Sequence, residues 1–319
     1  MNKNDLITCA FTSFNAEDTI GKALESAINQ TYLNIEILIV DDNSTDNTLV
    51  KIKKFSKENK IKIRIIKNFK NMGVAYSRNR CIENAQGKFI CFFDDDDISS
   101  VNRIEKQLSS LKKYEKVSLN GKTNKSPLCF TDRIIHYSNN KKLYCKGMYT
   151  FKLEDYKEEY INSLLSAGPF PKCGVLGSTA TCTLFARKST LIEINMFDEN
   201  LRRCEDLELS IKALKKGISI ISNNNILVNQ YYSNTEDKLN SNIYELKVIK
   251  INKDWLEERN LYEFAILYTQ LKHAFLKLDM LKFYMIVLRL IFTKPFKFIK
   301  SLISSSRAVL FSILNKIYI

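Results

Sequence analysis

Apolar runs alternate with segments of helical spacing along the first hundred residues. The apolar-rich segments lie at 6–11, 35–40, 61–66 and 89–93 and predict strands. The fourth carries no charge, which predicts a strand buried on both faces. Between the four, segments at about 17–29, 49–55 and 74–85 repeat apolar residues every three or four positions, which predicts amphipathic helices. This alternation predicts an α/β fold: a mostly parallel sheet with helices on both faces.

Polar residues mark the starts of the predicted helices. Asn15 precedes the first helix and is a plausible N-cap, and Thr45 or Asp46 can cap the second. Gly87 closes the third helix before the most apolar strand. The chain therefore supplies local signals for the boundaries as well as for the elements.

The fourth strand ends in four consecutive carboxylates, Asp94–Asp97. Adjacent like charges repel and raise one another's pKa unless a cation neutralises them. Hard oxygen ligands suit Mg²⁺ or Mn²⁺, so the cluster predicts a divalent metal site. An acidic turn after a strand is the plainer alternative.

Polar side chains follow several of the predicted strands. Thr12, Asp42 and the acidic cluster all lie at carboxyl ends, which in parallel sheets border the ligand crevice. The segment after the first strand, residues 12–16, lacks glycine. A dinucleotide site and a P-loop are therefore disfavoured, because their backbone could not approach a pyrophosphate closely.

The second half of the chain is less regular. Residues 128–135 predict a strand, 154–167 a helix, and 173–181 a loop of small residues before 182–185. Small residues allow a bulky ligand to approach, although an ordinary turn explains them equally well. Asp206 lies in the first turn of a predicted helix that Gly217 ends, where an acidic residue is favoured by the helix dipole alone.

Composition narrows the chemistry. The 319 residues are 45% hydrophobic and 26% charged, as in ordinary globular proteins. Eight cysteines at irregular spacings, without a CxxC pair, predict reduced core thiols in a cytosolic protein and disfavour structural zinc. Only two histidines occur, so a general base is expected to be a carboxylate. The N-terminus enters a strand at once, so no signal peptide is expected.

The net charge of +14 is concentrated at the C-terminus, where residues 280–319 hold seven basic residues and no acidic one. The apolar run 283–288 is too short to span a membrane. Lys297, Lys300 and Arg307 share one side of a helical wheel, which predicts a basic amphipathic helix lying in a membrane interface. A C-terminal helix packed on the domain is the alternative. Interleaved aliphatic residues disfavour nucleic acid.

Five motifs occur together in a fixed order. They are 11–15 (FTSFN), 40–46 (VDDNSTD), 71–79 (NMGVAYSRN), 87–97 (GKFICFFDDDD), and 197–199 with 204–209 (FDE, CEDLEL). This set resembles the family 2 glycosyltransferases of GT-A fold, over roughly residues 5–230. The prolines usual in two of the motifs are replaced by Phe11 and Ser100.

The resemblance implies a role for each matching residue. Thr12 and Asp42 would hold the base of a nucleotide-sugar, most often uracil. Phe14 would lie beside the base, Asp94 would contact the nucleotide-sugar, Asp96 would bind the ribose or the metal, and Asp97 would bind the metal. Asn15 is a further candidate for the nucleotide-sugar site. The acceptor side is expected at Glu205, next to Asp206, and at Gly177 and Ser178, which are candidates because of their small side chains and not because of the resemblance. Asp206 would be the catalytic base. Arg78 would reach the diphosphate, although an exposed helix arginine fits its position as well.

The expected protein is an inverting, metal-dependent hexosyltransferase that uses Mn²⁺ or Mg²⁺ and a nucleotide-sugar, with UDP the usual nucleotide. Its acceptor would be a glycan or a lipid-linked sugar of bacterial capsule, O-antigen or lipooligosaccharide. The expected location is cytoplasmic, peripheral on the inner face of the membrane through 280–319. Expected domains are 1–235, with halves 1–100 and 101–235, and a helical region 236–319. A sugar nucleotidyltransferase and a non-catalytic membrane scaffold remain alternatives.

Overall fold

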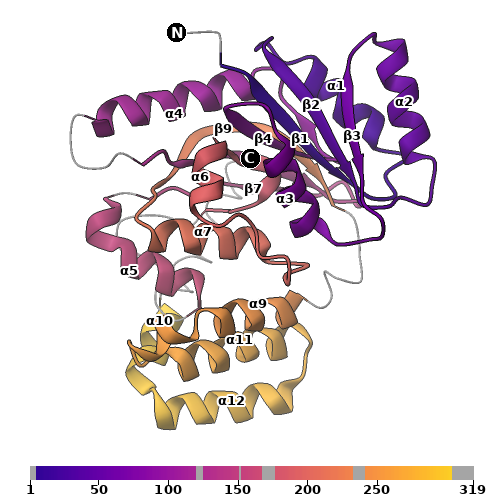
Figure 1. Ribbon diagram of the computed structural model, residues 1–319. Coiled ribbons are helices and arrows are strands. Elements are labelled where there is room, and N and C mark those ends of the chain that lie inside the picture. The colour runs from indigo at the N-terminus through magenta and orange to yellow at the C-terminus, as the bar shows by residue number, and fades with distance from the viewer. Residues whose placement is uncertain (1–4, 120–124, 151, 167–176, 233–240, 304–319) are drawn as a thin grey trace. The chain divides into compact units, whose positions relative to one another are not determined.

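The computed structural model describes residues 5–119, 125–150, 152–166, 177–232 and 241–303 (Figure 1). The strands are β1 (Ile7–Ser13), β2 (Ile35–Asp41), β3 (Ile63–Lys67), β4 (Phe89–Asp94), β5 (Ile98–Ser99), β6 (Leu128–His136), β7 (Lys142–Cys145), β8 (Phe185–Arg187) and β9 (Ile220–Tyr231). The helices are α1 (Ile20–Ile28), α2 (Thr48–Glu58), α3 (Val74–Asn84), α4 (Arg103–Leu119), α5 (Leu153–Leu164), α6 (Lys188–Glu193), α7 (Glu205–Lys215), α9 (Ser241–Ile251), α10 (Lys253–Glu257), α11 (Tyr262–Leu276) and α12 (Met280–Thr293). A further helix covers 295–303.

The strands of the described residues form one sheet in the order β3-β2-β1-β4-β8-β6-β9-β5, with β7 paired to β6. Strands β1 to β4 are mutually parallel, as predicted from the alternating pattern. From β8 onward the sheet is mixed, because β8 runs antiparallel to both β4 and β6 while β9 runs parallel to β6. The parallel half is therefore built from the crossovers of the first hundred residues, and the mixed half from the less regular sequence after them.

Helices cover both faces of the parallel half. Alternate residues of β1 (Ile7, Cys9 and Phe11) pack in one buried cluster with residues of α1, α2 and α4. Helix α3 lies against β1 and β2, and its buried residues are not part of that cluster. Side chains of a strand alternate between faces, so the apolar runs are explained by burial on both sides.

The chain forms two compact units, one of residues 1–150 with 177–234 and the other of residues 151–176 with 235–319. The expected boundary at 235/236 is therefore displaced by one residue. Helix α5, which was expected in the first domain, belongs to the second unit. The reason lies in its contacts, since Trp255 Nε1 donates to Asn162 Oδ1 at 3.0 Å and Arg259 pairs with Glu158.

One predicted cap is wrong. Asn15 adopts a left-handed conformation with φ of 50°, and its Oδ1 accepts a hydrogen bond from Thr45 N at 2.8 Å. Helix α1 begins later, at Ile20, after Thr19. Asn15 thus ties two loops together and does not cap a helix. Asp46 does supply a side-chain acceptor at the start of α2, from Thr48 N at 3.0 Å.

Candidate functional site

The carboxyl ends of three parallel strands meet at one edge of the sheet. In the strand register, Thr12 lies beside Val40 of β2 and beside Asp94 of β4. Asp42 follows directly, with its backbone N–H donating to Ser13 O at 2.8 Å. The convergence of Thr12, Asp42 and Asp94 that parallel packing predicts is confirmed by this register.

Asp42 is buried and already accepts several hydrogen bonds. Its two carboxylate oxygens accept from Met72 N and Gly73 N, each at 2.8 Å, and from Asn68 Nδ2 at 2.6 Å. These amides precede α3, so the carboxylate fixes the start of that helix. A carboxylate has about four lone-pair directions, so Asp42 retains room for one further donor such as the N–H of a nucleotide base.

The loop after β1 connects to the acidic cluster. Phe14 N donates to Asp95 Oδ2 at 2.9 Å, while the Phe14 ring is 46% exposed. Asn15 N donates to Ser44 Oγ at 3.0 Å. The backbone of this loop is therefore held from two sides, and the exposed ring of Phe14 is free of the core beside the predicted position of the base.

Two of the four carboxylates share a buried site with a thiol. Ligand atoms of Asp94, Asp97 and Cys182 lie within 4.8 Å of one another. Asp97 is only 3% exposed, and its Oδ1 accepts from Tyr231 N at 3.2 Å. The Cys182 thiol is a weak hydrogen-bond donor toward Asp97, but no nitrogen or oxygen donor of the described residues reaches the buried Oδ2.

The carboxylate of Asp97 is buried among like charges. Burial raises the pKa of Asp97 to about 8, and the neighbouring carboxylates Asp94 and Asp96 contribute to the rise. Burial together with the charge of Asp96 likewise raises the pKa of Asp95 to about 7. A buried oxygen without a donor amid like charges fits a divalent cation. Asp94 and Asp97 are the residues placed to hold it, and Asp96 as a ligand stays a prediction.

A buried arginine joins the acidic strand to the first turn of α7. Arg78 of α3 pairs with Glu205 Oε1 at 2.5 Å and with Asp94 Oδ1 at 3.1 Å, and its guanidinium lies 5.6 Å from the centre of the Phe197 ring. Arg78 is 5% exposed, so the exposed helix arginine that the sequence also allowed is excluded. In this arrangement its charge is shared between two carboxylates, and contact with a diphosphate stays a prediction.

Glu205 is buried and Asp206 is half-buried, and partial removal from water raises the pKa of both carboxyls. Burial raises the pKa of Glu205 to about 7; Arg78 opposes the shift and Asp206 adds to it. Burial also raises the pKa of Asp206, against the lowering effect of Arg78 and Arg133. A carboxylate whose pKa is raised is a better general base near neutral pH. Glu205 faces Arg78, so its assignment to the acceptor side has no support from these contacts.

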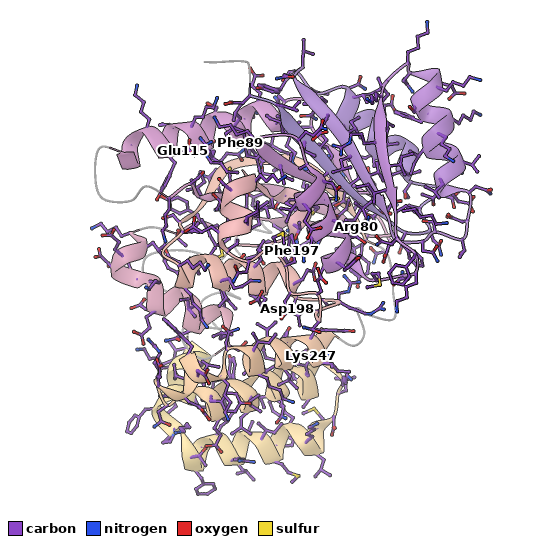
Figure 2. The ribbon with its side chains drawn as sticks, in the orientation of Figure 1. Arg80, Phe89, Glu115, Phe197, Asp198 and Lys247 are labelled. Atoms are coloured by element: carbon purple, nitrogen blue, oxygen red, sulfur yellow. The ribbon has the colours of Figure 1, made fainter. Side chains whose placement is uncertain are left out.

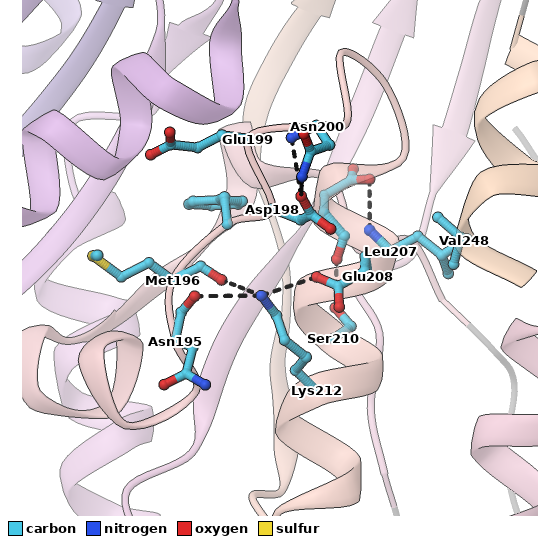
Figure 3. A network of polar contacts seen from close by, with 12 residues as sticks. Asn195, Met196, Asp198, Glu199, Asn200, Leu207, Glu208, Ser210, Lys212 and Val248 are labelled. Carbon is cyan, nitrogen blue, oxygen red and sulfur yellow. Dashed lines mark hydrogen bonds and ion pairs between the residues drawn. The ribbon is translucent and has the colours of Figure 1, made fainter. Parts of the chain in front are cut away.

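The segment 195–200, which precedes α7, is held by residues of α7 and α3 (Figure 3). Lys212 Nζ donates to Met196 O at 2.6 Å and pairs with Glu208 Oε2 at 3.0 Å. Asn79 of α3 accepts from Phe197 N at 2.9 Å, and Phe197 lies next to Asp198 in Figure 2. Contacts on both sides of the segment 195–200 thus fix where the first turn of α7 presents Asp206.

The small-residue loop is described only from Gly177 onward, and residues 173–176 lie outside the described part. Ser178 pairs with the segment around Gly147, where Ser178 N donates to Lys146 O at 2.7 Å. A Cβ on Gly177 would lie 2.2 Å from Gly147 O. The glycine is therefore needed for close approach of two backbones, and contact with an acceptor remains a prediction.

A chain of polar side chains, which sequence reasoning missed, leads from Ser178 to the acidic cluster. Arg133 donates through Nη1 to Ser178 Oγ at 2.5 Å and through Nε to Gln230 Oε1 at 2.9 Å. Gln230 Nε2 in turn lies 3.7 Å from Cys182 Sγ. These residues come from β6, β9 and the turn before β8. No local pattern marks them, because each lies in an ordinary strand or loop sequence.

We expect Arg78→Met to lower the free energy of unfolding by about 3 kcal/mol, the usual cost when a buried ion pair loses one partner. The loss leaves Asp94 and Glu205 without their shared cation. Urea unfolding measures it. Arg80→Met is the matched control on the same helix: Arg80 is half-buried and bonds to the amide oxygen of Asn68 at 2.7 Å. Equal losses in the two variants would show that the ion pairs of Arg78 contribute no more to the free energy of unfolding than the contacts of Arg80.

Comparisons with known proteins agree with this geometry. The model of the family "Glycosyl transferase family 2" matches residues 8–170. The Escherichia coli protein WfgD, a UDP-Glc:alpha-D-GlcNAc-diphosphoundecaprenol beta-1,3-glucosyltransferase, is 40% identical over 108 residues, which cover 34% of this chain and 42% of that protein. An uncharacterised glycosyltransferase of Rickettsia felis is 32% identical over 199 residues, 61% of this chain and 28% of the relative. The chain thus spans less than half the length of these curated relatives.

Solved structures show the same fold. Residues 1–349 of S. aureus TarS in complex with UDP superimpose with a TM-score of 0.56 at 19% identity, covering 85% of this chain and 72% of TarS 1–349. The complex with UDP-GlcNAc gives 0.53 at 18% identity, covering 76% and 66%. The predicted GT-A architecture with added C-terminal helices is confirmed. With the family model matching half of its length, the chain belongs to glycosyl transferase family 2.

Proposed function

We propose that this chain transfers a sugar from a UDP-sugar to a hydroxyl group of a lipid-linked or glycan acceptor, with inversion at the anomeric carbon. The observation that carries the proposal is the buried, donor-free oxygen of Asp97 beside Asp94, at the sheet edge that also bears Thr12 and Asp42. This arrangement suits a cation and a nucleotide. Membership of a glycosyltransferase family disfavours the alternative of a sugar nucleotidyltransferase.

The proposed donor side consists of the ends of β1, β2 and β4. Asp42 would accept the N–H of the uracil with its remaining lone pair, and the exposed ring of Phe14 would cover the base. Asp94 and Asp97 would hold Mn²⁺ or Mg²⁺, which when bound neutralises the charge on the departing diphosphate. Because Asp95 is anchored to Phe14 N, the base-binding loop and the carboxylates would move together.

On the acceptor side Asp206 would take the proton from the attacking hydroxyl. Its environment suits a general base, because burial raises its pKa while Arg78 and Arg133 keep it available as a carboxylate. Arg78 holds α7 against β4 through Glu205 and Asp94. The base and the donor site are thus joined by a single buried guanidinium, which would fix the distance between them.

The acceptor class is proposed from the relatives. WfgD is named for transfer to a diphosphoundecaprenol-linked sugar, and the TarS complexes contain UDP and UDP-GlcNAc. For this chain, surface polysaccharide synthesis at the inner face of a membrane follows as a proposal. Within the described ranges no helix is both long and apolar enough to cross a bilayer.

A panel of UDP, UDP-glucose, UDP-GlcNAc and GDP-mannose, with and without Mn²⁺, tests the donor site. A ligand at a hundred times its Kd stabilises the native state by about 2.7 kcal/mol, so we expect the melting temperature to rise by several degrees with UDP compounds and Mn²⁺ together. UDP without the metal should shift it little, because the carboxylates then repel the diphosphate. No shift with any uridine nucleotide would contradict the proposed donor.

A further inference from the structure

The second unit concentrates exposed apolar side chains at its C-terminal end. Of the 27 large hydrophobic residues that are exposed in the described residues, 14 lie between Phe275 and Ile303. Apolar residues scattered singly on a surface are normal, but a contiguous exposed cluster marks an interaction site. The basic-apolar surface, as we call residues 275–303 here, is therefore distinct from the ordinary surface of the chain.

Helix α12, yellow in Figure 1, is apolar on two faces. Its inner face packs on α11: Ile286 and Leu290 are buried with Phe264, Leu267 and Leu271. Its outer face repeats apolar residues at helical spacing, and these are exposed: Leu281 (76%), Tyr284 (59%), Met285 (63%), Leu288 (55%) and Phe292 (82%). Side chains of α12 project on the side away from α11 in Figure 2.

The helix at 295–303 continues the same surface. Phe298 is buried in the cluster with α11 and α12, whereas Phe296 is 88% exposed and Ile299 55% exposed. Its neighbours Leu302 and Ile303 are also about half exposed, at 47% and 50%. Two consecutive helices thus use one face for the core of the unit and leave the other apolar face uncovered by any described residue.

The charges of this surface are basic except for Asp279, which caps the start of α12. Residues 280–303 contain no Asp or Glu, and their basic residues are Lys282, Arg289, Lys294, Lys297 and Lys300. Lys282, Arg289 and Lys300 are exposed, although Arg289 also pairs with Glu263 at 2.8 Å. An apolar stripe bordered by cations matches an anionic bilayer, whose interior accepts the stripe and whose headgroups accept the cations.

A second copy of the chain fits this surface poorly. In a twofold dimer the same patch would face itself, so the cations of one copy would oppose those of the other. Like charges brought together out of water oppose association. A bilayer presents the opposite charge and imposes no such repulsion.

We propose that the outer face of α12, with the helix at 295–303, inserts in the plane of an anionic membrane interface and is the membrane contact of this protein. This proposal deepens the proposed function, because membrane contact would place the enzyme next to lipid-linked acceptors. It rests on the proposed function only for the reason why the protein binds a membrane. Within the range 280–319 that the sequence predicts for membrane contact, it assigns the contact to α12 and the helix at 295–303. The contact requires neither donor nor turnover, so the two proposals fail separately.

Co-sedimentation of the full-length protein with sucrose-loaded vesicles tests this. We expect binding to vesicles made mostly of phosphatidylcholine with a substantial minority of anionic phosphatidylglycerol. The double variant Leu288→Glu, Phe292→Glu should bind at least about tenfold more weakly, since two inserting apolar side chains become charged. Both positions are exposed, so the fold should tolerate the changes, and circular dichroism checks this.

Matched controls distinguish binding through this surface from non-specific binding to vesicles. Leu33→Glu with Phe69→Glu changes two residues that are 88% and 76% exposed in the first unit and should leave vesicle binding unchanged. Lys282→Glu with Lys300→Glu should weaken binding to anionic vesicles several-fold, whereas Lys53→Glu with Lys57→Glu on α2 should not. Raising the salt concentration should weaken binding as well, because it screens the cations.

Three results would overturn the proposal. The first is equal binding by the Leu288→Glu, Phe292→Glu variant and the unchanged protein. The second is failure of the unchanged protein to bind anionic vesicles. The third is a dimer, seen by light scattering without lipid, that the same variant abolishes, because the surface would then be covered by a second copy.

Discussion

Replacing Asp206 by asparagine is expected to lower kcat by about two to four orders of magnitude, the range that a positioned general base contributes. The KM for the UDP-sugar should change little, because Asp206 lies in the first turn of α7 and not among the strand ends proposed as the donor site. Asparagine keeps a side-chain oxygen that can accept the hydrogen bond now donated by Leu207 N to Asp206 Oδ1 at 2.7 Å. The start of the helix should therefore survive. Steady-state kinetics with the donor that stabilises the protein best measures the effect.

The control addresses the alternative that Asp206 merely favours a helix N-terminus. Asp155 lies in the first turn of α5 and is exposed, so Asp155→Asn removes an acidic residue of that kind without touching the site. We expect normal turnover from it. If Asp206→Asn retained the kcat of the unchanged enzyme, Asp206 would not be the base.

Asp97→Asn is expected to reduce kcat/KM by at least about a hundredfold and to make the metal-free protein more stable at pH 8. The first effect follows from loss of a proposed metal ligand, since a metal supplies several kcal/mol to the departure of a charged group. The second follows from burial. Asp97 is 3% exposed and carries a donor-free oxygen, and a neutral amide in its place removes a charge that the fold does not compensate.

The stability effect has a definite pH dependence. The pKa of Asp97 is about 8 in the folded chain against an ordinary value of 3.8, so between about pH 4 and pH 8 the folded state holds more protons than the unfolded state. Stability of the metal-free protein therefore falls as pH rises through that window. Asp97→Asn should flatten this decline and gain at least ~1 kcal/mol at pH 8, since each pKa unit is worth about 1.4 kcal/mol.

Urea unfolding at pH 5, 6.5 and 8 in the presence of a chelator measures this difference. Asp18→Asn serves as the control, because the Asp18 side chain is 93% exposed and should leave the curve unchanged. Parallel curves for Asp97→Asn and the unchanged protein would show that Asp97 is ionised and compensated in the native state. They would remove the electrostatic argument for a cation.

The parallel half of the fold could be predicted because its signals are local. Strands β1 and β4 are almost wholly buried apolar runs, β2 and the half-buried edge strand β3 are rich in aliphatic residues, and each crossover helix carries its own stripe of apolar residues. Once the strands are parallel, their carboxyl ends must lie on one edge, which is why Thr12, Asp42 and Asp94 could be placed together in advance. Short strands such as β5 escaped prediction because two residues, Ile98 and Ser99, carry no period.

The carboxylates of the candidate site could be predicted from the sequence, but the contacts that join its distant segments could not. Arg78 and Glu205 are 127 positions apart, and nothing near either residue signals that they pair. The apolar sequence around Cys182 predicts a core thiol. Its place beside Asp97 depends on how β8 packs against β4. Such contacts arise from tertiary packing between distant segments, which a single sequence does not encode locally.

In the C-terminal region, too, some features could be predicted from the sequence and others could not. Its basic charge could be predicted from composition. The two apolar faces of α12 could not, because a helix that is apolar all round is expected to be buried, and only packing on α11 shows which face is taken. The exposed face then becomes a surface that needs a partner.

The central claim is that a divalent cation binds at the end of β4, where Asp97 leaves a buried oxygen without a donor. Electron paramagnetic resonance of Mn²⁺ tests it most directly, since the signal of the free ion disappears on binding. In the presence of UDP, we predict one Mn²⁺ bound per chain by the unchanged protein and none by Asp97→Asn at the same concentrations. Equal binding by the two proteins, or an unchanged free-ion signal with both, would contradict the claim.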